Sequence, residues 1–258
     1  MEKKTILITG TNGFLAKNLI IFLKKKNFNV ISTSKDPKNK KFDLDLNKIQ
    51  NSILYLPKFD FLIHLAYVKK NTFYEEKKVN YNSAKTLFET AKNNKSKIIY
   101  ISSQSASINS FSNYGKIKYS IEELAKNYSS TIIRPGLVYK KKSFDGIFGK
   151  INKIIINYPI IVFPSGLNKK IYLCNIQKLL DNINKEINYN NQKSKFIKTD
   201  DKVAYSLKDL LIKIIKDNKK KTILLPLNYI VFFYFLKTLE QLKLDINLKS
   251  DSLLSLKE

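Results

Sequence analysis

Cysteine, histidine, arginine and tryptophan are almost absent from this chain of 258 residues. It contains one cysteine, Cys174, one histidine, His64, and no tryptophan. A single cysteine excludes a disulfide framework and metal sites built from several cysteines, and it indicates a reducing compartment. We therefore predict a cytoplasmic protein and no metal site.

Long apolar runs are also absent. The first apolar stretch, Thr5 to Ile8, is too short for the apolar core of a signal peptide and leads directly into Gly10. The aromatic run from Tyr229 to Phe235 is too short to span a bilayer, so no stable membrane insertion is predicted. We expect this run to be a buried core helix of a small lobe. A membrane-surface anchor is the alternative, since lysines surround it.

Negative charge is scarce. Lysine and arginine together number 47 against 21 acidic residues, which gives a formal net charge of +26. Arg134 is the only arginine, and the lysines are spread along the whole chain. Because bidentate contacts to phosphates and bases usually use arginine, we predict no nucleic-acid partner. The charge would instead help to attract anionic small molecules.

A glycine-containing turn follows the first apolar stretch. Thr5 to Ile8 predicts a strand, and the apolar residues from Leu15 to Leu23 recur at helical spacing. Gly10 provides the backbone freedom that the turn requires, and a side chain at Gly13 would keep a pyrophosphate from reaching the backbone. The phosphates would lie on free N–H groups at the positive end of the helix dipole.

The segment from Thr9 to Ala16 resembles the Gly-x-x-Gly-Phe-[Ile/Leu]-Gly turn of the extended short-chain dehydrogenase/reductases, the NAD-dependent epimerase/dehydratase family. Ala16 replaces the third glycine, which serves helix packing, so one extra methyl group should be tolerated. The resemblance implies an α/β fold with a doubly wound parallel sheet of the Rossmann type. In this turn it implies cofactor contacts from Gly10, Asn12, Gly13, Phe14 and Leu15.

The end of the second predicted strand, Phe28 to Ser34, bears on the choice of cofactor. NAD-binding relatives place an acid there to accept hydrogen bonds from the ribose. Here Ser34 and Lys35 occupy the position, and both suit a 2′-phosphate. We therefore favour NADP(H). NAD(H) stays possible, because Asp36 could turn inward.

Three more segments match the family in order along the chain. Asp60 to Ala66 matches its Asp-x-Val-Ile-His-Leu-Ala strand, Val79 to Ala84 its Val-Asn-x-x-Gly-Thr helix, and Ser130 to Tyr139 its Arg-Pro-x-x-Val-Tyr segment. His64, inside the first of these, is expected to be structural, and an Asp-Leu-x-Asp-like turn begins at Asp43. The further cofactor-binding residues implied by these matches are Asp43, Leu44, Leu65, Ala66, Tyr67, Asn80, Pro135 and Val138.

The predicted catalytic residues are Ser103, Tyr114 and Lys118. Tyr114 and Lys118 stand one helical turn apart, where an ammonium group would lower the pKa of the phenol toward working pH. Tyr114 would then act as general base, or as general acid in the reverse direction, while Ser103 holds the substrate oxygen. This constellation resembles that of the short-chain dehydrogenases.

The resemblance implies a nucleotide-sugar substrate, bound in part by Ser103, Gln104 and Lys169. No titratable residue follows Ser103 directly, so dehydration is not expected, and we favour reduction of a 4-keto sugar in surface polysaccharide biosynthesis. A 4-epimerase is the alternative. The segment Asn175 to Lys178 lacks the acid usual in the family, which leaves a non-catalytic NADP(H)-binding scaffold as a rival.

We expect a Rossmann-type domain over residues 1–165 and a small substrate lobe over 166–258, with part of 171–185 able to rejoin the first domain. A homodimer is possible.

Overall fold

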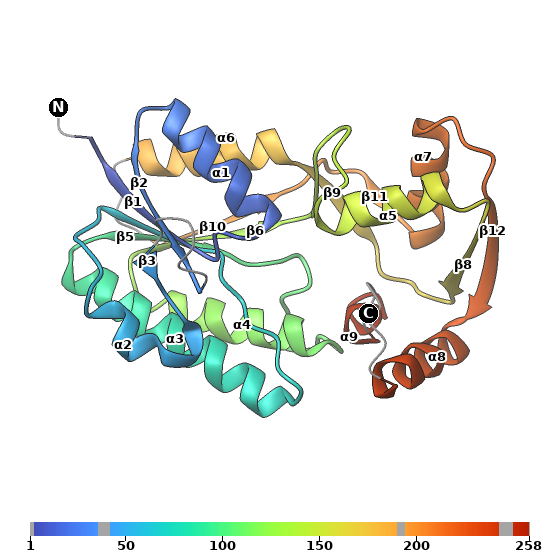
Figure 1. Cartoon of the computed structure of the whole chain (residues 1–258), viewed down its shortest axis with the longest axis horizontal. Coiled ribbons are helices and arrows are strands. Elements are labelled where there is room, and N and C mark those ends of the chain that lie inside the picture. Colours follow the sequence, from blue (N-terminus) through green and yellow to red (C-terminus); the bar gives the residue numbers. More distant parts are fainter. Residues whose placement is uncertain (1–2, 36–41, 190–193, 243–249, 258) are drawn as a thin grey trace.

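A seven-stranded parallel sheet forms the centre of the structure (Figure 1). The computed structural model describes residues 3–35, 42–189, 194–242 and 250–257. Asp36, which the cofactor prediction left open, lies outside these residues. The strand order is β10-β6-β5-β4-β1-β2-β3.

The strands are β1 Thr5–Thr9, β2 Asn29–Ser34, β3 Phe42–Asp43, β4 Phe61–His64, β5 Lys97–Ile101, β6 Ser130–Pro135, β7 Leu137–Tyr139, β8 Ile160–Ser165, β9 Ile171–Asn175, β10 Lys195–Thr199, β11 Ala204–Tyr205 and β12 Ile223–Asn228. The α-helices are α1 Phe14–Lys25, α2 Ile49–Ile53, α3 Phe73–Asn93, α4 Asn113–Ala125, α5 Gly146–Asn157, α6 Ile176–Asn188, α7 Leu207–Asp217, α8 Tyr229–Gln241 and α9 Ser250–Leu254. A short 3-10 helix, η2, spans Leu46–Lys48.

The central strands are buried on both faces. All four residues of β4 are buried, as expected for a continuous apolar run in a parallel sheet. Helices α1 and α6 cover one face, and α2, α3 and α4 cover the other (Figure 1). These layers confirm the predicted doubly wound α/β fold.

The chain changes direction beside β1. It passes from β1 to β2 on one side of the sheet and returns to β4 on the other, so β1 lies between β2 and β4. In such sheets a crevice opens outside the carboxyl ends of the strands at this switch point. The glycine turn and the loop after β4 both lie there.

A smaller lobe is built mainly from residues after β7. Helices α5 and α7 pack together with the partly buried side chains of β8 and β12, which form a parallel pair. Helix α6 and strand β10 return to the large sheet, because α6 packs on α1 and β10 pairs with β6. The boundary between the two predicted domains at residue 165 stays a proposal. The part that rejoins the first domain extends beyond 171–185, to the end of β10 at Thr199.

The aromatic run is not the buried core helix that we predicted. It forms most of α8, but only Phe232 and Leu236 of this helix are buried, against Leu253 of α9. Tyr234 and Phe235 are 62% and 56% exposed. One side of the run therefore packs in the lobe and the other faces solvent.

None of the helices within the described residues has the length and apolar content needed to cross a bilayer.

Candidate active site

The turn after β1 depends on Gly10 for its shape. Gly10 has φ of +73°, and a Cβ atom there would lie 2.7 Å from the backbone Cα of Ala66. A side chain would therefore be strained and would also push β1 away from the loop after β4. The fold itself requires glycine at this position.

Gly13 differs, because the protein around it leaves room for a side chain. Its φ is −70°, and an added Cβ would meet only the Gly10 carbonyl oxygen, at 3.4 Å. No side chain caps the first N–H groups of α1, which begins at Phe14. Uncapped N–H groups beside a bare backbone suit a phosphate group, so these residues fit the pyrophosphate of a dinucleotide.

Thr9 joins the turn to the loop after β4. Its Oγ1 accepts hydrogen bonds from the backbone N–H groups of Leu65 and Ala66, each at 3.1 Å, and bonds to His64 Nδ1 at 2.9 Å. His64 is 1% exposed, and burial, with a smaller contribution from Lys118, lowers its pKa to about 3. It is a neutral, packed side chain here.

The end of β2 brings the predicted ribose-binding residues next to the turn. Ser34 is buried, and its hydroxyl accepts a hydrogen bond from the Asn12 amide at 3.0 Å, while Lys35 is exposed. Asp43, an exposed residue of β3, pairs with Ser34 of β2. The backbone N–H of the buried Leu44 donates to the Ser34 carbonyl. Asn12, Lys35 and Asp43 therefore gather around one strand end.

The three predicted catalytic side chains come together at the ends of β5 and α4. Ser103 and Tyr114 are hydrogen-bonded through their hydroxyls. Lys118 is 3% exposed, donates to the Ile101 carbonyl oxygen at 2.9 Å, and places its Nζ 5.7 Å from the centre of the Tyr114 ring. The α4 helix brings Tyr114 and Lys118 onto the same face, as their spacing predicted.

Lys118 lies among three tyrosine rings. Its Nζ is 4.9 Å from the ring centre of Tyr100 and 5.6 Å from that of Tyr67, in addition to Tyr114. Ring faces attract an ammonium group but do not replace its water shell. Burial lowers the pKa of Lys118 to about 7, against a smaller opposing effect of Glu122.

The prediction that Lys118 lowers the pKa of Tyr114 is wrong. Burial raises the pKa of Tyr114 to about 12, although its hydrogen bond with Ser103 acts in the opposite direction. Lys118 does not reverse this effect, because burial leaves it only partly charged near pH 7. Tyr114 therefore keeps its proton at neutral pH.

The buried Lys118 predicts a pH dependence of stability. Because its pKa falls from 10.5 to about 7 on folding, the unfolded chain binds more protons between these values, and the free energy of unfolding should rise with pH across this window. We expect the stability of wild type relative to Lys118→Met to grow from about pH 7 to about pH 9 in urea titrations. Lys126→Met, an exposed substitution at the end of α4, is the control. A difference that stays constant with pH would contradict the buried assignment.

Arg134 fixes the other side of α4. Its Nε donates to Oε1 of Glu122 at 2.7 Å, and its Nη2 bonds to the second oxygen. Glu122 is 2% exposed, and this two-point contact with the guanidinium compensates the burial of its carboxylate. The sequence did not mark Glu122, since nothing local distinguishes it from a solvated helix residue.

Glu76 is a second buried acid that sequence reasoning missed. Tyr67 donates from its hydroxyl to Oε1 of Glu76 at 2.5 Å, and its ring packs edge-on against Tyr114 with centres 4.8 Å apart. The other oxygen of Glu76 accepts from the Lys70 backbone N–H at 2.9 Å. Glu76 thus orients the side chain that packs on the predicted catalytic tyrosine.

Asn80 holds the loop after β4. Its amide nitrogen donates to the carbonyl oxygens of Val68 and Glu76, and its amide oxygen accepts from the Val68 backbone N–H. Both amide hydrogens are therefore engaged within the protein. Asn80 holds the segment after β4, as its place inside a helix suggested.

Gln104 and β9 form the side of the site toward the small lobe. Gln104 Oε1 accepts from the Tyr172 backbone N–H at 3.2 Å, and the backbone N–H of Gln104 donates to the Pro135 carbonyl. Lys169 is partly buried and lies three residues before Tyr172, in the segment that leads into β9. Val138 pairs with Cys174 between β7 and β9. The predicted substrate residues thus lie on or near connected elements.

The acid missing from the Asn175 to Lys178 segment is supplied from elsewhere. The Asn175 backbone N–H donates to Asp201 Oδ1 at 3.3 Å, and the Asn175 side chain caps α6. Asp201 follows β10, some 26 residues later. This turn therefore has a carboxylate beside it, although its own segment lacks the acid of the family's pattern.

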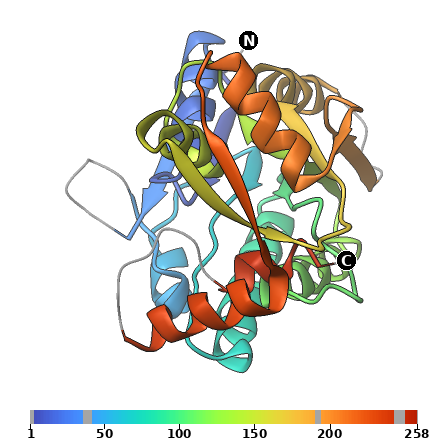
Figure 2. The same ribbon diagram turned by 90° about the vertical axis from the view of Figure 1, so that its right-hand side faces the viewer.

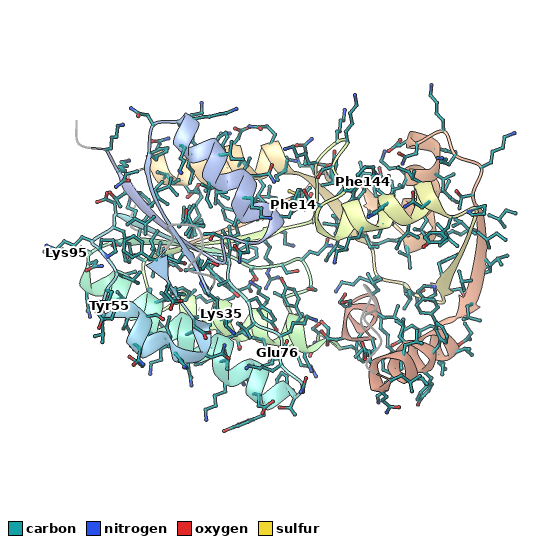
Figure 3. The ribbon with its side chains drawn as sticks, viewed as in Figure 1. Phe14, Lys35, Tyr55, Glu76, Lys95 and Phe144 are labelled. Carbon is teal, nitrogen blue, oxygen red and sulfur yellow. The ribbon has the colours of Figure 1, made fainter. Side chains whose placement is uncertain are left out.

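The loop after β7 lies over the first turn of α1. Lys140 Nζ donates to Asn18 Oδ1 at 2.9 Å, and the Phe14 ring fills the space beside Gly146. Figure 3 shows Phe14 and Phe144 where α1 meets the lobe. Lys140, which replaces a glycine of the family's pattern, thus connects this loop to α1.

The C-terminal helix α9 also reaches the site. Asp251 Oδ1 accepts from the backbone N–H of Asn113, the first residue of α4, at 2.8 Å. Its Oδ2 pairs with Lys69 Nζ at 3.3 Å. The residue next to Tyr114 is therefore held by a side chain from the end of the chain.

Comparison with known proteins gives one family and many similar folds. The model of the NAD dependent epimerase/dehydratase family matches residues 6–146. A comparison with curated protein sequences gives no match.

Three solved structures illustrate the shared fold. The dTDP-4-dehydrorhamnose reductase of Bacillus anthracis in complex with NADP is 18% identical, with a TM-score of 0.73 over 89% of this chain and 87% of that chain. UDP-N-acetylglucosamine 4-epimerase from Bacillus cereus is 15% identical, with a TM-score of 0.73 over 98% and 94%. MoeE5 in complex with UDP-glucose and NAD is 15% identical, with a TM-score of 0.73 over 87% and 85%.

Proposed function

The chain belongs to the NAD dependent epimerase/dehydratase family, whose model matches more than half of it, and on that premise we propose that it is an NAD(P)-dependent enzyme acting on a nucleotide sugar. The observation that carries the proposal is the convergence of Ser103, Tyr114 and Lys118 next to the loop after β4, which packs against Gly10. The substrate class is proposed because similar structures are a reductase and an epimerase of nucleotide sugars.

The residues around the crevice would hold the cofactor. The turn from Gly10 to Leu15 would take the pyrophosphate on backbone N–H groups, and Ser34, Lys35, Asp43 and Leu44 would lie toward the adenosine. The remaining proposed contacts are Leu65, Ala66, Tyr67, Tyr114, Lys118, Pro135 and Val138, with Asn80 acting through the loop that it holds. When bound, NAD(P)(H) supplies or accepts the hydride.

The protein's own part of the chemistry is the proton. Tyr114 keeps its hydroxyl proton at neutral pH, so it is ready to donate to a sugar carbonyl oxygen as that oxygen gains charge. Ser103, hydrogen-bonded to Tyr114, would hold the same oxygen, and Gln104 and Lys169 would contact the substrate on the lobe side. In the reverse direction, Tyr114 takes the proton from a sugar hydroxyl.

Within this family we propose reduction of a 4-keto sugar, with 4-epimerisation as the alternative. Gln104 and Ser105 follow Ser103, and neither titrates, so the pair of acid and base that elimination of water requires is missing here. A protonated Tyr114 favours donation to a ketone. Surface polysaccharide biosynthesis, a homodimer and a cytoplasmic location stay part of the proposal.

Absorbance of NADPH tests the reaction. The protein is mixed with NADPH and either a 4-keto or a 4-hydroxy nucleotide sugar. Stoichiometric oxidation of NADPH by the keto sugar supports reduction. Interconversion of C4 epimers without net loss of cofactor would identify an epimerase, and tight NADPH binding with neither reaction would favour the scaffold.

The cofactor preference gives a separate prediction. Because Lys35 is exposed at the end of β2 beside Ser34, we expect NADPH to bind more tightly than NADH. Lys35→Glu should narrow the preference by about tenfold or reverse it, since it removes a cation and adds an anion near the 2′-phosphate. Titration of both cofactors by fluorescence measures this, with Lys48→Glu, an exposed change in η2, as the control. Equal affinities of wild type for both cofactors would contradict it.

A further inference from the structure

One face of the β8–β12 pair is apolar and exposed. Side chains alternate along the two strands, so Ile161, Phe163 and Leu224 pack inward against the core of the lobe. The opposite face carries Ile160, Val162, Ile223 and Leu225, which are 46–59% exposed. The strand register places Ile223 opposite Ile160 and Leu225 opposite Val162. Four apolar side chains therefore form one patch on the outer side of the lobe.

The helix after β12 continues with a second apolar stripe. Ile230, Val231, Tyr234 and Phe235 are 55–62% exposed. Their spacing places them on one side of α8, opposite Phe232 and Leu236, which are buried. These four side chains therefore form an exposed stripe along α8.

Figure 2 looks onto the end of the molecule that carries both features. It shows β12 crossing the side nearest the viewer and running directly into α8. We call the eight exposed residues of β8, β12 and α8 the outer lobe face. The sheet residues are paired across neighbouring strands, the exposed helix residues follow in the next element, and exposed apolar patches of this kind usually mark an interaction site.

Lysines predominate in the segments that carry the outer lobe face, although Asp217 and Glu240 flank the second of them. Residues 218–239 contain no acidic residue but include Lys219, Lys220, Lys221 and Lys237, all of them exposed. No acidic residue lies between Asp145 and Asp181 either, in the segment that contains β8. Lysine stems can lie along apolar surface while their ammonium groups reach outward. An apolar patch with a cationic border fits a surface that is apolar inside and negatively charged at its rim.

We propose that the outer lobe face docks on a membrane surface that contains anionic lipids. The aromatic and aliphatic side chains enter the boundary between headgroups and acyl chains, and the lysines contact the anionic headgroups. Helix α8, which is only 13 residues long, lies in the plane of the interface and does not cross the bilayer. The face lies at the lobe end of the molecule (Figure 2), whereas Phe14, directly after the glycine turn, lies toward the middle, where α1 meets the lobe (Figure 3).

Sedimentation of the full chain with lipid vesicles tests the proposal. We expect binding to phosphatidylcholine vesicles that contain phosphatidylglycerol, and little binding to pure phosphatidylcholine. Part of the binding should survive salt above physiological strength, because burial of apolar side chains is not screened. Val231→Gln/Phe235→Gln should weaken binding by about tenfold or more, since two apolar side chains no longer enter the interface. Ile223→Thr/Leu225→Thr tests the sheet patch independently.

Matched control variants come from the other end of the molecule. Leu54→Gln/Tyr55→Gln removes two apolar side chains that are even more exposed, at 75% and 81%, and that lie at the end of the molecule where Figure 3 labels Tyr55, so it should leave binding unchanged. Changing Lys219, Lys220 and Lys221 to Gln should weaken binding more than changing Lys24, Lys25 and Lys26 to Gln, although the net charge changes equally. NADPH binding, which does not involve this face, checks that each variant is folded.

Two outcomes would overturn the proposal. In the first, the two triple lysine variants lose vesicle binding equally and Val231→Gln/Phe235→Gln loses none. The net charge of the whole protein would then bind the vesicles non-specifically. A concentration-dependent dimer in sedimentation velocity that Val231→Gln/Phe235→Gln abolishes would identify the face as an interface between two copies of the chain.

Discussion

Tyr114→Phe is expected to lower turnover by about two to four orders of magnitude, the range that a positioned acid or base contributes. The substitution removes only the hydroxyl that bonds to Ser103 and leaves the ring, which packs edge-on against Tyr67. Binding of NADPH should therefore change little. Single-turnover oxidation of NADPH by the keto sugar, together with a fluorescence titration of the cofactor, separates the two effects.

Tyr67→Phe is the matched control for that variant. It also removes one tyrosine hydroxyl in the site, but this hydroxyl bonds to Glu76 and not to Ser103. We expect it to cost far less turnover than Tyr114→Phe. If the two variants lose activity equally, or if Tyr114→Phe turns over normally, the proton is moved by another group.

Arg134→Met is expected to lower the free energy of unfolding by about 3 kcal/mol, because removing one partner of a buried ion pair leaves the other charge unpaired. The Glu122 side chain is 2% exposed and that of Arg134 is 21% exposed. We take the lower end of the usual range for this reason. Urea denaturation followed by circular dichroism measures the change.

Two companion variants isolate the ion pair. Adding Glu122→Met to Arg134→Met should recover much of the lost stability, since two apolar side chains then replace the two charges. Lys126→Met, which breaks the exposed pair with Glu123 at the end of α4, should cost at most about 0.5 kcal/mol. A loss in Arg134→Met as small as that of the exposed pair would show that Glu122 is hydrated in solution.

The sequence predicted the central sheet well because its signals are local. Continuous apolar runs such as Phe61 to Ile63 are long enough to indicate buried strands, and a helix with Tyr114 and Lys118 one turn apart needs no distant partner. The spacing alone therefore indicated that these two side chains share one face of α4.

The prediction failed where a residue's state depends on distant parts of the chain. Glu122 depends on Arg134 across α4 and β6, and Asn175 depends on Asp201 from a later strand end. The pKa of Tyr114 depends on how deeply the finished fold buries it, which spacing does not report. The aromatic run of α8 has the composition of a core helix, but in the fold only Phe232 and Leu236 of that helix are buried.

The contact between Asp251 and Asn113 has a consequence for the order in which the site is completed during synthesis. The two residues are 138 positions apart, so the carboxylate that holds the first residue of α4 is made long after α4 itself. The glycine turn and most of its neighbours in the sheet are already present by then. The first residue of α4 therefore gains this contact only after the other described strands and helices have been made.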